Sequence, residues 1–228
     1  IFNLRGSDID YNPVFQSYAI ITADKAFLLA APSQLSDTSL NSSLTLEPYT
    51  EYATVLSRLV KNKTVWIDPK LVTQGTVNLI KSHGGNIVEN LHPIEKLKAL
   101  KNDAEIYGMQ QANLQASIAI TKTLKWLDDQ HQAGNSVNED SARLELEKNY
   151  AELPNFKGLS FNTISGAGSN SSIVHYGTPD PNKTLEEGDF YLVDSGVQYI
   201  GDDWLGSTDC TRTTVFGAPN KEQIQYFT

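Results

Sequence analysis

The chain has 228 residues and a formal net charge of -9, a length that allows one large domain or two small ones. This acidic balance argues against a nucleic-acid or anionic-membrane surface, and no apolar run approaches the ~20 residues of a membrane span. The single cysteine, Cys210, excludes an internal disulfide framework and is typical of a reducing compartment, so we expect a cytoplasmic protein.

Residues 1–92 alternate between short strand-like and helix-like segments, which favours an α/β layer structure. Turn-prone residues, Thr22 to Asp24, separate the first two strands, and Gly84 and Gly85 are free to adopt the positive φ that ends a helix. Strands are expected at residues 15–21, 26–30, 65–67 and 87–88, and helices at residues 49–61 and 71–81.

A domain boundary is expected at His92-Pro93, because proline biases the residue before it away from the helical conformation. The chain then divides into residues 1–92 and residues 93–228. It opens on Ile1 with neither an initiator methionine nor a signal-like segment, and its last residues, 225–228, fall within a helical pattern. We therefore expect an interior piece of a longer polypeptide.

A long amphipathic helix is expected after Asp103, which is a plausible N-cap. Its apolar stripe should lie on a sheet, with Gln110, Gln111 and Lys122 facing outward. A second helix is expected to begin at Asn138-Glu139-Asp140. The stripe of the first helix consists of Ile106, Met109, Ala116, Ile120, Leu124 and Leu127.

One histidine, His175, lies in an apolar run that reads as a strand, Ile173-Val174-His175-Tyr176, after Phe161-x-Thr163-Ile164-Ser165-Gly166. A lone histidine in such a strand is more often a hydrogen-bonded core residue than a catalytic one. From the residues alone, both interpretations stay open.

The last part of the chain predicts an antiparallel hairpin that carries two aspartates. Residues 190–199 and 211–216 are rich in aromatic and β-branched side chains, and the turn-rich segment 200–206 connects them. Asp194 and Asp209 then stand on neighbouring strands and can share one face of the sheet. Two bare carboxylates there would repel each other, so a hard divalent cation such as manganese, magnesium or calcium is a natural partner. Solvated aspartates at strand ends are the alternative.

The order of residues in this hairpin resembles a known family. The motif is Asp194-Ser195-Gly196-x-Gln198-Tyr199, followed by Thr208-Asp209-x-Thr211-Arg212-Thr213-x-x-Phe216-Gly217-x-Pro219. It resembles the first metal-binding hairpin of the Xaa-Pro aminopeptidases (aminopeptidase P), within the creatinase, prolidase and methionine aminopeptidase superfamily. Three further segments resemble the same family: Asn3-Leu4-Arg5-Gly6-Ser7-Asp8, then Asn12-Pro13-Val14-Phe15-x-Ser17-Tyr18-Ala19, and the run from Ile94 to Glu105.

The resemblance implies both a fold and a site. The fold is a creatinase-like α/β domain over residues 1–92, followed by the first half of an α+β pita-bread catalytic domain over residues 93–228. Two divalent metal ions, usually manganese, are implied, with Asp194 and Asp209 among their ligands. His175 matches a histidine that lines the substrate pocket, so it is our candidate catalytic and substrate-binding residue. Arg212 could support the metal ligands through charge-assisted hydrogen bonds, or form a structural ion pair instead.

The family holds its metals with a histidine and two glutamates as well, which should lie beyond Thr228. We therefore expect the 228-residue chain to be inactive alone. One departure from the family is the segment from Ile200 to Ser207, which replaces a short Asp-Gly-Thr turn. Asp202 and Asp203 in this longer tip lack the flanking residues of the motif. An enlarged tip is tolerated where the strand register is kept.

The function implied for the parent protein is a metal-dependent aminopeptidase that removes the N-terminal residue from peptides with proline in second position. An X-Pro amide has no N–H, which excludes most other peptidases. We expect peptide substrates, no nucleic-acid or membrane partner, and a homodimer of the full-length protein. Two alternatives stay open: a non-catalytic pita-bread protein used as a binding or regulatory module, and a creatinase- or prolidase-like hydrolase of another small substrate.

Overall fold

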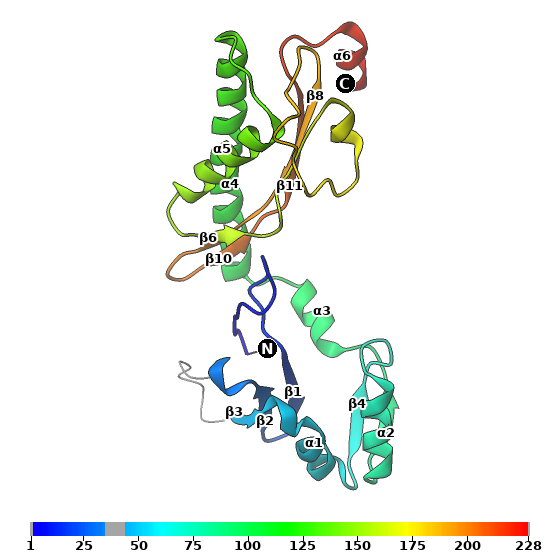
Figure 1. Ribbon diagram of the computed structural model, residues 1–228. Coiled ribbons are helices and arrows are strands. Elements are labelled where there is room, and N and C mark those ends of the chain that lie inside the picture. The colour runs from blue at the N-terminus through cyan, green and yellow to red at the C-terminus, as the bar shows by residue number, and fades with distance from the viewer. Residues whose placement is uncertain (1, 35–43, 228) are drawn as a thin grey trace. The chain divides into compact units, whose positions relative to one another are not determined.

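The computed structural model describes residues 2–34 and 44–227, and the chain divides into two compact units, Ile1–Leu100 and Lys101–Thr228 (Figure 1). The division falls after the short helix α3 (Pro93–Ala99), whereas the sequence analysis placed it before Pro93. Pro93 is the first residue of α3, and the side chain of His92 caps the helix by accepting from the amide of Ile94. Among the described residues, no helix is long and apolar enough to cross a membrane.

The first unit contains the alternating strands and helices expected of an α/β domain. β1 and β2 pair antiparallel, β3 joins β2 in parallel, and β4 and β5 form a separate parallel pair. The expected strands and helices are confirmed, whereas β3 and α3 were not anticipated. The elements are β1 (Ser17–Ile21), β2 (Ala26–Ala30), β3 (Leu44–Pro48), α1 (Tyr52–Val60), β4 (Thr64–Ile67), α2 (Gln74–Ser82) and β5 (Asn86–Glu89), with short 3-10 turns at Pro32–Gln34 and Tyr49–Glu51.

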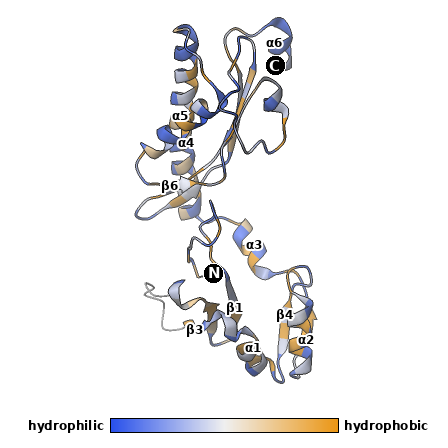
Figure 2. Ribbon diagram, viewed as in Figure 1, coloured by the Kyte–Doolittle hydropathy of each residue, from blue (hydrophilic) through white to orange (hydrophobic). Residues whose placement is uncertain are grey.

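Two helices of this unit pack their apolar faces on β4 and β5. Leu56, Val60, Ile67 and Ile80 are buried together, and the hydrophobic colour in Figure 2 gathers on β4 and the neighbouring α2. α2 begins after Thr73, whose side chain accepts a hydrogen bond from the amide of Thr76. This cap explains why the helix starts later than the apolar pattern, which begins at residue 71.

The second unit has the α+β composition expected from the sequence. Strand β9 pairs with β6 and β10 in one small sheet, and β8 pairs with β7 and β11 in another. The elements are α4 (Asp103–Gln132), α5 (Glu139–Ala151), β6 (Phe156–Leu159), β7 (Ile164–Ala167), β8 (Phe190–Ser195), β9 (Val197–Ile200), β10 (Leu205–Ser207), β11 (Cys210–Val215) and α6 (Lys221–Phe227), with a 3-10 turn at Gly168–Ser172.

Helix α4 packs on the sheet formed by β6, β9 and β10. The expected apolar stripe is confirmed in its later part, where Ala116, Ile120 and Leu127 are buried and Leu124 packs against the core, and is wrong at its start. Ile106 and Met109 are exposed, whereas Ala112 and Ala119, which lay outside the expected stripe, are fully buried. The reason is a close approach of backbones, because a Cβ on Gly108 would collide with the carbonyl of Leu205 in β10. Only small side chains fit under a strand at that distance.

The two helix starts in this unit are fixed by capping boxes. Asn102, rather than the expected Asp103, is the N-cap of α4: its side chain accepts from the amide of Glu105, and the Glu105 carboxylate accepts from the Asn102 amide. Asn138 caps α5 in the same way through Ser141, which agrees with the expected start. The reciprocal pairing decided between the neighbouring residues 102 and 103.

Candidate metal centre

The hairpin predicted around the two aspartates is present. β8 and β9 run on from each other, β10 and β11 return alongside them, and the turn between β9 and β10 spans residues 201–204 (Figure 1). In the antiparallel pairing of β8 with β11, Asp194 stands opposite Thr211. Asp209 directly precedes β11, two positions before Thr211, so the two-residue alternation of a strand places it on the same face as Asp194. Continued strand alternation thus predicts that both carboxylates share one face of the hairpin.

Asp194 carries a carboxylate oxygen that lacks a partner. Its side chain is half-buried, and Oδ1 is buried with no hydrogen-bond partner among the described residues. A buried charged oxygen left in this state costs more than the ~1–3 kcal/mol of an ordinary unsatisfied group. A cation at this position would remove that cost, and carboxylate oxygens are the ligands that hard divalent metals prefer. The residues present therefore fit a metal-binding role.

Asp209 is exposed and lines a cavity of about 380 Å³ in the second unit. The wall combines a hydrophobic thioether and an aromatic ring with several hydroxyl and amide groups, as small-molecule sites usually do. The lining residues are Met109, Asn113, Ser160, Phe161, Ser207, Thr208 and Asp209.

Ser160 ties together the two strands that carry the aspartates. Its amide donates to the carbonyl of Gly196 (3.0 Å), and its hydroxyl donates to the carbonyl of Thr208 (2.7 Å). Thr208 also exchanges two hydrogen bonds with the backbone of Val197, one through its amide and one through its Oγ1. The backbone beside each carboxylate is thus held in place by several bonds. The sequence analysis did not identify Ser160, because an isolated serine carries no pattern.

A buried phenol, that of Tyr150, holds the end of β8 next to Asp194. The Tyr150 hydroxyl lies 2.8 Å from Oγ of Ser195, the residue after Asp194, and both side chains are fully buried. Burial raises the pKa of Tyr150 to about 12, so the group is a neutral phenol at physiological pH. The end of β8 is therefore fixed against α5 by a neutral hydrogen bond.

His175 lies in a turn after the 3-10 segment, which corrects the expected strand over residues 173–176. Ile173 and Val174, read as apolar strand residues, are exposed to 50% and 83%. His175 has a φ of 54°, in the left-handed region that non-glycine residues rarely adopt. Its side chain is exposed and is not among those that line the cavity beside Asp209. Backbone strain of this kind is concentrated at functional sites.

Arg212 pairs with Val193 across the two strands, so it stands on the face opposite Asp194. Its side chain is exposed, and Nη1 donates to the carbonyl of Thr211 at 2.8 Å. The strand register therefore does not favour the prediction that the Arg212 guanidinium supports the metal ligands directly. Among residues 2–34 and 44–227, no three His, Cys, Asp or Glu side chains gather in a group that could hold a metal.

Comparison with known proteins divides the chain at nearly the same place as the structure. Residues 1–105 match the Creatinase/Prolidase N-terminal domain, and residues 107–228 match Metallopeptidase family M24. The chain is 37% identical to a "Probable Xaa-Pro aminopeptidase P" of Laccaria bicolor, covering all of this chain and 36% of that protein. It is 35% identical to "Xaa-Pro aminopeptidase ApepP" of Drosophila melanogaster, covering 99% of this chain and 37% of that one.

Solved structures are also similar to this chain over almost its whole length. The X-prolyl aminopeptidase of Caenorhabditis elegans, described as a cytosolic enzyme with a di-nuclear active site, is similar with a TM-score of 0.78 and 26% identity. That similarity covers 97% of this chain and 37% of that protein. The prolidase of Pyrococcus furiosus shares the fold, with a TM-score of 0.68 and 20% identity. The chain thus spans little more than a third of the length of the curated relatives it matches.

Proposed function

The chain belongs to metallopeptidase family M24, and from that premise we propose that it is part of a metal-dependent aminopeptidase that removes the N-terminal residue preceding proline. The observation that carries the proposal is Oδ1 of Asp194 in β8, which is buried and has no hydrogen-bond partner among the described residues. Asp209, just before the paired strand β11, is proposed to stand on the same face of the hairpin. The expected fold class is confirmed: a creatinase/prolidase N-terminal α/β domain followed by the first part of an M24 pita-bread domain.

Asp194 and Asp209 are the residues of this chain proposed to hold two divalent ions, with manganese as our first choice. When bound, such a pair polarises the scissile carbonyl and supplies a hydroxide nucleophile at neutral pH. The di-nuclear active site named for the Caenorhabditis elegans enzyme supports the number of ions. The remaining ligands are proposed to come from the part of the protein outside this chain, which would also cover the exposed Asp209.

His175 is proposed to contact the substrate or to move a proton at the reacting amide. Its left-handed backbone supports a functional role, because strain persists only where the surrounding structure enforces it. Arg212 is proposed to act on the metal site only indirectly, since the strand register places it on the face opposite Asp194. Peptides with proline in second position are the proposed substrates, in agreement with the names of the relatives. A cytoplasmic location and a homodimer of the whole protein are also proposed.

The test replaces one proposed ligand in the full-length protein. Asp194→Asn keeps the size of the side chain but removes its charge, so metal affinity should fall by more than the roughly 10–100-fold typical of losing a residue that only supports a ligand. Asp203→Asn is the matched control, since Asp203 is an exposed aspartate in the tip of the same hairpin. Bound manganese is measured by elemental mass spectrometry, and turnover by release of arginine from an Arg-Pro-Pro peptide.

Loss of metal and turnover in Asp194→Asn, with both retained in Asp203→Asn, is the expected result. Unchanged manganese content in Asp194→Asn would remove this residue from the metal site. Normal metal binding by the parent protein without release of arginine would instead favour the non-catalytic binding module.

A further inference from the structure

Glu139, the first residue of α5, is a fully buried carboxylate whose two oxygens each accept two hydrogen bonds. Oε1 accepts from the amide of Ala167 (2.7 Å) and from Nδ2 of Asn170 (3.0 Å). Oε2 accepts from the hydroxyl of Tyr176 (2.7 Å) and from the amide of Asp180 (2.9 Å). Four donors therefore replace the water that this charge loses on burial.

These donors all belong to one segment, residues 167–180, and lie at both of its ends and in its middle. The segment leaves β7, passes through the 3-10 turn and contains His175. Most of its other side-chain bonds are local, such as those from the hydroxyls of Ser171 and Ser172 to the carbonyls of Gly168 and Ser169. Asn170 Nδ2 also donates to the Tyr176 hydroxyl (3.0 Å), and Asn162 donates to the carbonyl of Gly177. Glu139 is thus the point at which the loop is closed onto the helix.

The backbone of Glu139 holds the same residue to two neighbouring segments. Its carbonyl accepts from Oγ of Ser165 in β7 (2.7 Å), and its amide donates to the carbonyl of Lys183 (3.1 Å). The carboxylate also lies at the N-terminus of α5, where the helix dipole favours a negative charge. The anchor therefore cannot shift easily toward the loop, so the loop must conform to it.

A carboxylate is the side chain that this arrangement requires. A glutamine would direct its NH2 group at one of the two pairs of donors, whichever way it turned, and a donor cannot accept those bonds. Burial, and after it the hydrogen bond to Glu139, raises the pKa of Tyr176 to about 12, so the phenol keeps the proton that it donates. An apolar residue would fill the space but would leave four donors unsatisfied.

We propose that Glu139 is a positioning residue, which fixes the segment 167–180 and thereby sets the place and strained backbone of His175 in the proposed aminopeptidase site. The left-handed φ of His175, next to the anchored Tyr176, is the kind of conformation that persists only when its surroundings over-determine it. The inference rests on the proposed function for its catalytic consequence, whereas the control of the loop by Glu139 stands independently of it.

The experiment compares Glu139→Gln with Asp140→Asn in the full-length protein. Asp140 is the next residue of the same helix turn, and its carboxylate pairs with Arg143 at 2.7 Å rather than with the loop. Asp140→Asn therefore controls for removing one negative charge at the helix N-terminus. In Glu139→Gln, amide hydrogen exchange of residues 168–177 should accelerate, and kcat at equal metal occupancy should fall by about 10–100-fold through misplacement of His175. Asp140→Asn should change neither.

Tyr176→Phe is the second variant, because it removes only one of the four donors and leaves the carboxylate satisfied by the others. It should reproduce the faster exchange of residues 168–177 to a smaller extent, and serves as the deciding measurement if Glu139→Gln does not fold. Its effect should largely disappear when it is combined with Glu139→Gln, as expected for two residues in one hydrogen-bonded network.

A purely structural role predicts a lower unfolding midpoint in Glu139→Gln but an unchanged kcat per folded molecule, and that result would overturn the proposal. Wild-type exchange of the loop in both Glu139→Gln and Tyr176→Phe would overturn it as well. If the parent protein shows no turnover at all, the proposed function fails, whereas the exchange measurements still decide whether Glu139 controls the loop.

Discussion

Two carboxylates of the second unit, Glu139 and Asp194, differ in how many hydrogen-bond donors surround them, and this difference indicates different roles. Glu139 is fully buried, and both of its oxygens have two donors. Asp194 is half-buried, and its Oδ1 has none among the described residues. A satisfied buried carboxylate fixes the backbone around it, whereas an unsatisfied one carries a cost that a bound cation can offset. The same chemical group therefore serves as an anchor at one position and as a ligand candidate at the other.

Gly196, two residues after Asp194, is expected to tolerate no side chain. A Cβ there would collide with Oγ of Ser160 and with the backbone carbonyl of Thr208, which cannot turn aside as a flexible side chain can. Gly196→Ala should lower the free energy of unfolding by about 1–3 kcal/mol, measured by urea denaturation. Gly177→Ala is the control, since the nearest atoms to its Cβ would lie at 3.7 Å. Equal midpoints for the two variants would show that the strands can part without cost.

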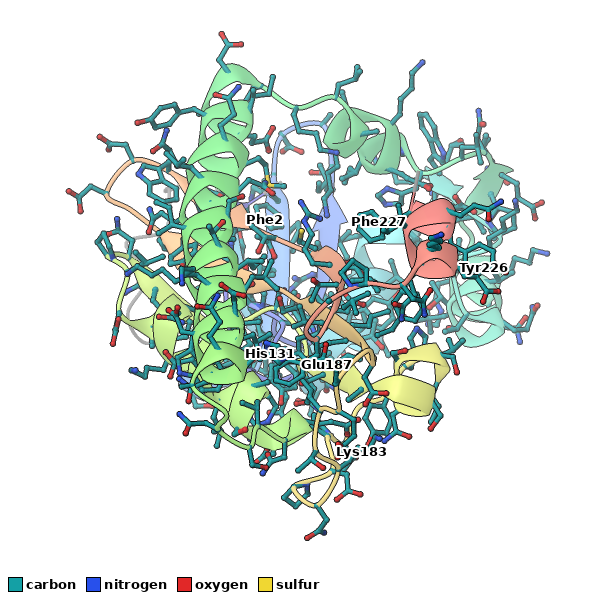
Figure 3. The ribbon with its side chains drawn as sticks, turned by 90° about the horizontal axis from the view of Figure 1, so that it is seen from above. Phe2, His131, Lys183, Glu187, Tyr226 and Phe227 are labelled. Carbon is teal, nitrogen blue, oxygen red and sulfur yellow. The ribbon has the colours of Figure 1, made fainter. Side chains whose placement is uncertain are left out.

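At the scale of elements, helix α4 is fixed to the sheet at both of its ends. Near its start, Gly108 in α4 and Gly206 in β10 allow the two backbones to touch. Near its end, Nε2 of His131 forms a hydrogen bond with a carboxylate oxygen of Glu187, which precedes β8 (Figure 3). The other oxygen of Glu187 accepts from the amide of Ala218 after β11 (3.0 Å). This His131–Glu187 clamp joins the helix to both strands of the aspartate hairpin.

The clamp predicts a stability change in acid. The Ala218 amide, and after it His131, holds the pKa of Glu187 below its usual value, so the folded state favours the ionised carboxylate. The resulting stabilisation is complete above the unfolded pKa of ~4.3 and is lost as the pH falls through the folded value. When the pH is lowered from about 5 to about 3, the stability of Glu187→Gln should therefore fall less than that of the wild type. The unfolding midpoint of each protein is measured by thermal unfolding across that range. Parallel pH profiles would contradict the clamp.

At the scale of the whole molecule, each of the two units has a hydrophobic core of its own. The larger core, in the second unit, includes Tyr150, Tyr191 and Tyr199, all fully buried. In the first unit the buried residues form two smaller clusters, one around Leu56 and Ile80 and one around Phe27 and Leu29. Helix α3, at the end of the first unit, contributes no buried residue to any of these clusters. Segments with few buried contacts are those that open locally and admit proteases.

Limited trypsin digestion is expected to cut first after Lys96, Lys98 or Lys101. These lysines are exposed in and after α3, and Leu97 and Leu100 between them are exposed to 69% and 72%. Mass spectrometry should find two resistant fragments that correspond to the two units. First cuts within α4 or the hairpin would show that the segment around α3 is more protected than its exposure implies.

The 228-residue chain alone is expected not to hydrolyse Xaa-Pro peptides. Two carboxylates cannot satisfy two hard divalent ions, each of which takes about six ligands. The assay adds manganese and an Arg-Pro-Pro peptide to the chain and looks for released arginine. Turnover comparable with that of a full-length relative would show that Asp194 and Asp209 suffice, and would contradict the need for further ligands.

The sequence by itself determined most helices and strands and the hairpin on which the proposed metal site lies. Alternating apolar residues and a turn-rich tip predicted the hairpin, which is confirmed, whereas the shared face of Asp194 and Asp209 stays a prediction. Hydrophobic spacing predicted both long helices of the second unit, and the order of the hairpin motif identified the family. Each of these signals lies within a short stretch of chain, where periodicity and turn chemistry dominate.

Only the tertiary structure decided which apolar residues are buried and which residues far apart in the chain form hydrogen bonds. Ile106 and Met109 belong to an apolar pattern but are exposed, because the backbones of Gly108 and β10 meet at the start of α4, whereas Ile120 and Leu127 further along the same pattern are buried. His175 looks like a strand residue, yet its segment is closed into a loop by Glu139 from a remote helix. Such contacts depend on the distance between segments far apart in the chain, and local spacing carries no information about that distance.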